Sequence, residues 1–221
     1  PLWSRGLGDV YKRQNINSPS GLSPVRTITG APFNEQGQLF AIANDASNSY
    51  AIGDVVVVAG GSDDNGTAYV TKMLADSDTP LGVIVGIQQA SASNSLEGTT
   101  LALNQIYLPV NSGLRYVYVV TDPQVIYEVQ DTVGASAGNI GSNAGMDYTA
   151  DQTSLSMSSP QSSTVVKHST IAALTEPGSA DLPLQILGLS QKANNTFGAY
   201  SKLLVTFNRH QYKQAAGTPA A

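Results

Sequence analysis

Residues 115–130 hold two runs of β-branched and aromatic residues on either side of Asp122 and Pro123. Valine and tyrosine fit the pleated, half-buried surface of a strand, and a proline that follows aspartate favours a turn. This pattern predicts two extended segments joined by a turn. Similar runs recur along the chain with no catalytic constellation beside them, so the sequence predicts an all-β architectural protein.

The first fourteen residues differ from the rest of the chain. Residues 4–14 resemble the translation of a transposase sequencing adapter, so we expect residues 1–14 to be a leader that is not native and the native chain to begin near Asn15. A genuine basic arm is the alternative. Removing Arg5, Lys12, Arg13 and Asp9 lowers the counts from 11 basic and 16 acidic residues to 8 and 15, a formal charge of about −7. A negative body opposes binding to a phosphate backbone, and we expect no direct nucleic-acid partner.

The remaining chain of about 207 residues is long enough for one large β domain or two small ones. It has no cysteine, which excludes disulfides and thiolate zinc sites. No apolar run approaches the roughly 18 residues of a membrane span, so we expect no membrane partner. Charged residues make up 12% of the chain, against about a quarter in ordinary domains. Such compositions are common in extracellular β proteins and viral shell components, and an unusually neutral monomer is the alternative.

The strand pattern begins near Val25. Residues 15–24 mix Ser, Asn, Gly and Pro, which predicts a flexible, extended arm. The run at 52–59 is continuously β-branched, as expected for a strand buried on both faces, so an aspartate at Val56 or Val57 should unfold the domain. A glycine-rich connection at 60–66 follows. The other predicted strands lie at 25–29, 38–43, 67–74, 80–87, 101–110, 116–130, 164–168, 182–189 and 200–212.

Residues 132–163 change to Gly, Ser, Ala, Asn, Asp and Thr with few large apolar anchors. A plain loop of this length is improbable in a compact domain, so we expect an ordered excursion that packs on the domain or on a neighbouring subunit. Residues 213–221 read as a disordered tail. The prediction is a single β-rich domain over 25–212, built as an antiparallel β-sandwich or partly closed barrel with a long loop-rich insertion and an extended N-terminal arm.

The two histidines, His168 and His210, are the first candidates for catalysis. A hydrolase needs a nucleophile, a base and an orienting acid that converge in space. A Ser-His-Asp triad is formally possible, but structural or surface histidines explain both positions more simply. We therefore expect no enzymatic activity and no catalytic residues.

Clustered carboxylates raise the question of a cation. Residues 63–66 (Asp-Asp-Asn-Gly) and the pair Asp76 and Asp78 offer oxygen ligands for Ca²⁺, yet neither fits the EF-hand loop with its terminal glutamate. Turn chemistry explains both segments, and we expect neither a metal site nor a cofactor.

Two further patterns have ordinary explanations. Asp122, Glu128 and Asp131 suggest a carboxylate pair for glycoside hydrolysis, but a strand-turn-strand segment accounts for them. The glycines at 60–61 and 138–141 lack the residues of a P-loop and the spacing of a dinucleotide fingerprint, so they read as connectors.

The order of several segments resembles that in tailed-bacteriophage head decoration proteins. The resemblance spans residues 25–212 and is carried by GAP at 30–32, GD at 53–54, PLGVIVG at 80–86, RYVYVVTDP at 115–123, LPLQILG at 182–188 and GAYSKLLV at 198–205. It implies a cement protein that binds the exterior of a phage capsid and stabilises the shell by bridging capsomers. It also implies the phage major capsid protein as partner, a homo-oligomer such as a dimer or trimer, and a place on the virion after assembly in the host cytoplasm.

A binding module is the alternative function. A virion-surface or extracellular β domain would use the excursion at 132–163 to recognise a glycan or a host receptor, with Tyr148 as the first contact residue. Co-sedimentation with capsids separates the two functions.

Overall fold

The computed structural model describes residues 15–34, 36–43, 47–88, 106–110, 113–148, 161–173 and 178–212. Within these ranges the regular structure is β-strand, apart from two single-turn 3₁₀ helices, η1 (Ala137–Asn139) and η2 (Ser179–Asp181). The all-β prediction is confirmed. The predicted leader at 1–14 and tail at 213–221 lie outside the described residues.

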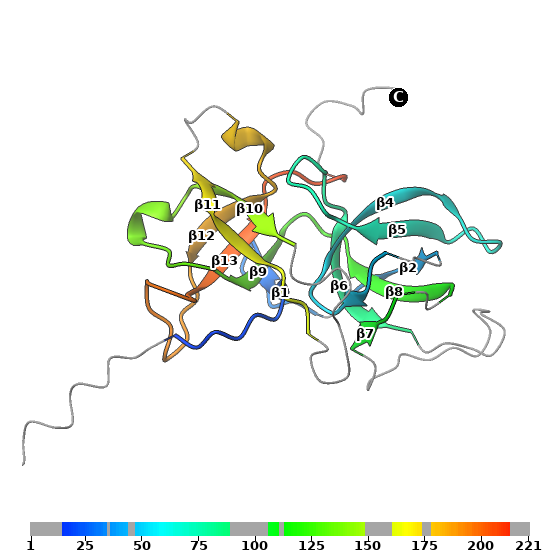
Figure 1. Ribbon diagram of the computed structural model, residues 1–221, viewed down its shortest axis with the longest axis horizontal. Coiled ribbons are helices and arrows are strands. Elements are labelled where there is room, and N and C mark those ends of the chain that lie inside the picture. The colour runs from blue at the N-terminus through cyan, green and yellow to red at the C-terminus, as the bar shows by residue number, and fades with distance from the viewer. Residues whose placement is uncertain are drawn as a thin grey trace, which may run out of the picture.

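One half of the molecule is a closed barrel, seen at the right of Figure 1. Its strands follow the order β2-β5-β4-β6-β8, and every pairing is antiparallel except the contact of β2 with β5 at Ala41 and Tyr69. The barrel strands are β2 (Gln38–Ile42), β4 (Val55–Ser62), β5 (Ala68–Lys72), β6 (Gly82–Ile87) and β8 (Arg115–Val120). A small ribbon of β3 (Tyr50–Ala51) and β7 (Tyr107–Leu108) accompanies it.

The other half is a six-stranded antiparallel sheet in the order β1-β9-β13-β12-β10-β11. A parallel bridge between Asp131 and Val166 brings β11 back beside the end of β9, so the sheet curls on itself. Its strands are β1 (Ser23–Thr27), β9 (Val125–Gln130), β10 (Asn143–Asp147), β11 (Val165–Ala172), β12 (Leu184–Leu189) and β13 (Lys202–Phe207).

A shared hydrophobic core joins the two halves. The cluster inside the sheet also contains Val55, Met73, Val83 and Val120, which come from the barrel strands and their ends. A second cluster, which includes Phe40, fills the barrel itself. The chain therefore forms a sandwich-like, barrel-containing arrangement, as the sequence predicted.

The β-branched run at 52–59 is buried on both faces only at its centre, because Val55 packs into the sheet core and Val56 into the barrel core. Val55 and Val56 are buried, whereas Val58 is 39% exposed, so the expected burial on both faces is wrong beyond Val56. The strand also continues through the predicted connection. Gly60 and Gly61 adopt φ of 79° and 76°, and the register shifts between Val58 and Ser62. Because glycine tolerates positive φ, these residues form a bulge inside β4, and the turn is confined to 63–66.

The predicted flexible arm is held against the body along residues 15–22. Asn15 Nδ2 donates to the carbonyls of Thr196 and Ala199 at 2.8 Å each. The Gln130 side chain accepts from Ser18 N at 2.9 Å. Leu22 is 1% exposed and belongs to the sheet core, and β1 begins at the next residue. The arm is extended, as expected, but hydrogen bonds and one buried leucine fix it.

The segment at 132–163 is ordered where the structure describes it. Residues 143–147 form β10, which lies between β12 and β11 in the sheet. This part is an integral strand rather than an excursion, because the small residues Ala144 and Gly145 allow close packing at the junction with the barrel. Residues 149–160 lie outside the described part of the chain.

Candidate functional site

A buried ion pair, Asp54 with Lys72, lies where the barrel meets the sheet. Lys72 Nζ is 2.9 Å from Asp54 Oδ2, and the two side chains are 1% and 0% exposed. Asp54 directly precedes β4, while Lys72 ends the neighbouring strand β5. The alternation of β5 puts Lys72 on the same face as buried Val70, which is the signal in the sequence that could have revealed it.

Hydrogen bonds saturate the Asp54 carboxylate from both sides. Ala51 N donates to Oδ2 at 2.8 Å, and Ser162 Oγ donates to Oδ1 at 2.5 Å. Thr164 Oγ1 lies 3.5 Å from the same Oδ1. Lys72 Nζ also donates to the carbonyl of Ser49 at 3.3 Å. Asp54 therefore connects the barrel to the segment that leads into β11.

Two more polar contacts join the barrel to the sheet. Asp76, in the β5–β6 loop, accepts at Oδ1 from Met146 N at 2.9 Å and from the Tyr148 hydroxyl at 3.2 Å. Arg209, just after β13, donates to the carbonyls of Asp181 at 2.6 Å and Ser77 at 2.7 Å. These contacts fix the two halves relative to each other.

Tyr148, the expected contact residue for a receptor, is buried. Its side chain is 6% exposed and its hydroxyl donates to Asp76. Burial, together with the nearby Asp76 charge, raises the pKa of Tyr148 above its ordinary value. The prediction that this residue recognises a ligand is wrong, because its polar atom is already used inside the fold.

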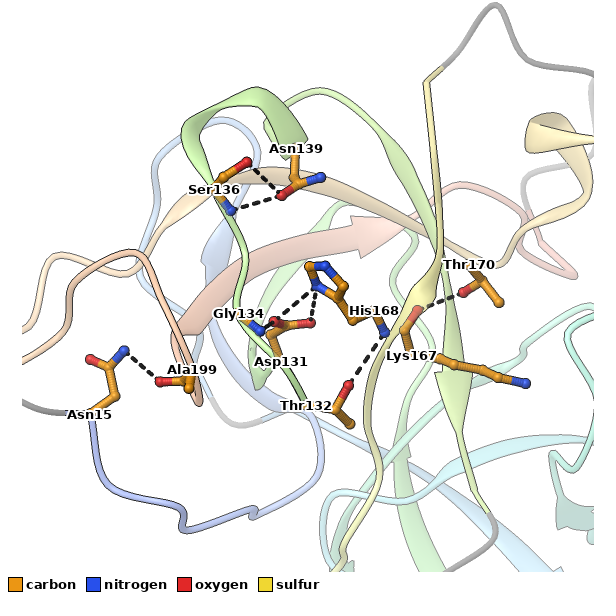
Figure 2. A network of polar contacts seen from close by, with 10 residues as sticks. All are labelled: Asn15, Asp131, Thr132, Gly134, Ser136, Asn139, Lys167, His168, Thr170 and Ala199. Carbon is orange, nitrogen blue, oxygen red and sulfur yellow. Dashed lines mark hydrogen bonds and ion pairs between the residues drawn. The ribbon is translucent and has the colours of Figure 1, made fainter.

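Figure 2 shows the ring of His168, on β11, turned toward Asp131 at the end of β9. His168 Nδ1 lies 3.2 Å from Asp131 Oδ2, which also accepts from Gly134 N at 2.6 Å. The neighbouring hydroxyls bond elsewhere. Ser136 Oγ donates to Asn139, and Thr132 Oγ1 accepts from His168 N at 3.4 Å. Among the described residues, this histidine-carboxylate pair has no nucleophile in contact with its ring.

His210 has a different environment. It is buried, and its ring packs 5.8 Å from Phe207 and 5.9 Å from Tyr212, measured between ring centroids. Its Nδ1 accepts from Tyr212 N at 3.0 Å. His210 follows β13 whereas His168 lies on β11, so the two histidines have different neighbours.

The carboxylates at 63–66 organise the β4–β5 hairpin. Asp63 Oδ1 accepts from the backbone of Asn65 at 3.0 Å and Thr67 at 2.7 Å, and its Oδ2 accepts from the Tyr116 hydroxyl at 2.6 Å. Burial would raise the pKa of Asp63, but these hydrogen bonds outweigh it and hold the pKa below its ordinary value. Burial and the Asp63 contact raise the pKa of Tyr116.

The carboxylates of Asp122, Glu128 and Asp131 each bond a different partner, so no two of them form the carboxylate pair of a glycoside hydrolase. Asp122 accepts from Gln124 N at 2.8 Å in the turn. Glu128 bonds Lys192 at 2.6 Å, and Asp131 faces His168. Because Glu128 and Asp131 are three residues apart at the end of one strand, they point to opposite faces. In the described residues, no group of three or more His, Asp or Glu side chains could hold a metal ion, and no helix is long and apolar enough to cross a membrane.

A groove of about 980 Å³ lies between the start of the sheet and the barrel wall. Leu22 and Phe33 contribute apolar walls, whereas Gln36, Gln38 and Asp122 are exposed polar groups among its lining residues. None of the described residues that line it is a lysine or an arginine. The groove therefore suits a neutral ligand with both polar and apolar surface.

Three neighbouring segments at the far end of the sheet, at the left of Figure 1, each carry an exposed apolar side chain. Ile16 is 78% exposed, Val133 65% and Phe197 42%. Their segments are neighbours, because Asn15 Oδ1 accepts from Thr196 N at 3.0 Å and Gly198 N donates to the Ala135 carbonyl at 3.0 Å. We call Ile16, Val133 and Phe197 the end patch.

No protein-family model, curated protein or solved structure matches this chain. The resemblance to phage head decoration proteins stays a prediction, and the function has to be argued from the geometry above.

Proposed function

We propose that the protein is a structural component of a phage virion, which binds the exterior of the capsid and stabilises the shell by bridging capsomers. The observation that carries the proposal is the end patch, where Ile16, Val133 and Phe197 expose apolar surface on adjoining segments. Apolar patches that stay exposed on a folded protein mark interaction sites. The cores of protein interfaces are depleted in charge, and the three residues of the end patch are all apolar.

The use of the ionisable groups supports the same function. Asp54, Asp63, Asp76 and Asp131 each hold neighbouring segments through hydrogen bonds or ion pairs. Each of these carboxylates accepts hydrogen bonds within the fold, so we infer that these groups stabilise the protein instead of converging on a substrate. A protein that acts by binding needs this internal rigidity, because a preorganised surface loses less entropy on association.

Binding would stabilise the shell by mass action. A ligand that binds the assembled shell and not the free subunits shifts the assembly equilibrium by an amount that grows with its concentration over its dissociation constant. Many copies on one particle multiply a modest contact. A homo-oligomer placed on a local symmetry axis would bridge several capsomers at once.

Co-sedimentation with capsids of the parent phage tests the proposal. We expect the protein to pellet with capsids, and Phe197→Ser to weaken that binding because it removes apolar area from the end patch. The matched control is Val58→Ser, since Val58 is a similarly exposed apolar residue on the barrel. Absence of the wild-type protein from the pellet, or equal binding by both variants and the wild type, would contradict the proposal.

A deletion that tests the role of the arm has to be shorter than the arm predicted from the sequence, residues 15–24. Removing residues 15–24 would delete Leu22 from the core and two residues of β1, so loss of binding could reflect unfolding. A chain that starts at Pro19 keeps both. We expect this chain to fold and to bind capsids more weakly, because it lacks Ile16 of the end patch.

A second candidate function is recognition of a neutral glycan, and the groove beside Leu22 favours it. Tyr118 offers an aromatic surface there, and Gln36, Gln38 and Asp122 offer donors and acceptors. Glycan-array binding that is lost in Gln38→Ala, with no co-sedimentation with capsids, would replace the first proposal with this one.

A further inference from the structure

We propose that Lys72 and Asp54 become joined by an intramolecular amide bond, an isopeptide cross-link inside the barrel. The starting geometry is the 2.9 Å contact between Lys72 Nζ and Asp54 Oδ2. Both side chains lie away from solvent, and each residue directly precedes a buried core residue, Val55 after Asp54 and Met73 after Lys72. The inference depends only on this pair and is independent of the proposed function.

Burial makes the charged pair an unfavourable end state. Two charges removed from water lose hydration that their mutual attraction repays only in part. An amide carries no net charge, and it keeps one donor and one acceptor for the polar atoms nearby. The exposed pair Lys192 and Glu128 offers the contrast within the same chain, because Lys192 is 66% exposed and its charge stays hydrated.

The hydrogen bonds to Asp54 activate its carboxyl carbon. Ala51 N–H donates to Oδ2 and the Ser162 hydroxyl donates to Oδ1, so both oxygens have a donor fixed in place. When an amine attacks the carboxyl carbon, negative charge develops on these oxygens. Donors held at that position stabilise the tetrahedral intermediate in the manner of an oxyanion hole. The nucleophile, Lys72 Nζ, already contacts the carboxylate, so the reaction does not have to bring the two groups together.

The reaction balances without any other reactant. One proton passes from the Lys72 ammonium to the Asp54 carboxylate, which leaves an amine and a carboxylic acid. The nitrogen lone pair attacks Cγ and forms the C–N bond. A second proton moves from nitrogen to the departing hydroxyl, the C–O bond breaks, and one water molecule leaves. The amide nitrogen keeps the third hydrogen, and nothing is oxidised or reduced.

The cross-link would have a structural consequence. Asp54 and Lys72 stand at the open end of the β4–β5 hairpin, so the bond would close a covalent loop in a chain that has no cysteine. A cross-link of this kind restricts the unfolded chain and prevents the two strands of the hairpin from separating at their open end. It would give a cysteine-free protein a covalent staple.

Intact mass spectrometry of the purified wild-type protein tests the proposal directly. We expect a mass lower than the sequence mass by one water molecule, once the spectrum has stopped changing with incubation. Trypsin should fail to cut after Lys72. Chymotrypsin cuts after Tyr69, which separates Asp54 from Lys72 in the sequence, so it should release the two as one branched peptide.

Controls separate this bond from other dehydrations. Lys72→Met should restore the full mass, and no branched peptide should contain Lys192 with Glu128. Ser162→Ala should slow the mass change, because one donor to the carboxyl is lost. The wild-type measurement decides the outcome even where a variant fails to fold. A full sequence mass at the endpoint, with cleavage after Lys72, would overturn the proposal, as would a water loss that fragmentation places elsewhere.

Discussion

Strands β6 and β8 approach so closely at Gly82 that the structure allows no side chain there. A Cβ built at Gly82 would lie well inside 3.0 Å of the Val120 carbonyl oxygen and 2.9 Å from Val119 Cγ1. Because the first of these atoms is backbone, β6 has to move away from β8 before a methyl group fits. Overpacking costs about 1–3 kcal/mol, and we expect Gly82→Ala to reach the upper end, about 3 kcal/mol. For a chain of this length that corresponds to a fall in Tm of about 6–12 °C.

Gly188 on β12 provides the matched control. A Cβ at Gly188 meets no atom within 4 Å, and its backbone does not adopt a positive φ. Gly188→Ala should therefore stabilise the protein slightly, by about 0.4–1 kcal/mol, through the unfolded chain. Urea denaturation of both variants and the wild type measures the two free energies of unfolding. If the free energies of unfolding of Gly82→Ala and Gly188→Ala differ by less than about 0.5 kcal/mol, the close approach of β6 and β8 is wrong.

Three further perturbations test other parts of the fold. Val56→Asp should destabilise by more than about 4 kcal/mol because it buries an unpaired charge, whereas Val58→Asp on the exposed stretch of β4 should keep a native circular dichroism spectrum. The pKa of Asp63 is lowered in the folded state, so its carboxylate stabilises the protein above its ordinary pKa of 3.8, and this contribution is lost as the pH falls through the folded pKa. Wild type should therefore be more stable than Asp63→Asn at neutral pH, with a gap that closes in acid, and a gap independent of pH in urea titrations would contradict the assignment. Lys192→Ala should change the free energy of unfolding by at most about 1 kcal/mol, since its pair with Glu128 is exposed, and a larger loss by urea denaturation would show that the pair is more than a surface contact.

The strands could be predicted because each shows its own pattern. The runs at 80–87 and 116–130 became β6, β8 and β9 with small changes in their ends. Strand β10 was harder to recognise. Its sequence, Asn-Ala-Gly-Met-Asp, has low strand propensity, and Gly145 is required there because a Cβ would collide with the Asp76 carboxylate. That requirement comes from a loop about seventy residues away, which no local pattern shows.

The polar contacts were the least predictable part. Asp54 follows a glycine, a position typical of a turn, and nothing nearby in the sequence indicates its partners Lys72 and Ser162. The contact with Ser162 spans 108 residues. Such pairs depend on how the barrel and the sheet are placed, so they emerge only from the tertiary structure. The arm was misjudged for the same reason, because Leu22 is one apolar residue among Ser, Gly and Pro and its burial depends on distant strands.

These contacts show how the chain uses its few charged residues, which make up 12% of the sequence. Asp54 and Asp76 each bond atoms on the other half of the molecule, and Arg209 bonds loop atoms from both the barrel and the sheet. Charged groups that are bonded inside the fold contribute little to the electrostatic attraction of a partner from solution. Recognition would then depend on shape and on apolar contact at Ile16, Val133 and Phe197, and such contact works only when the surface is rigid. The same internal contacts supply that rigidity, which connects the use of the charged residues to the binding function we propose.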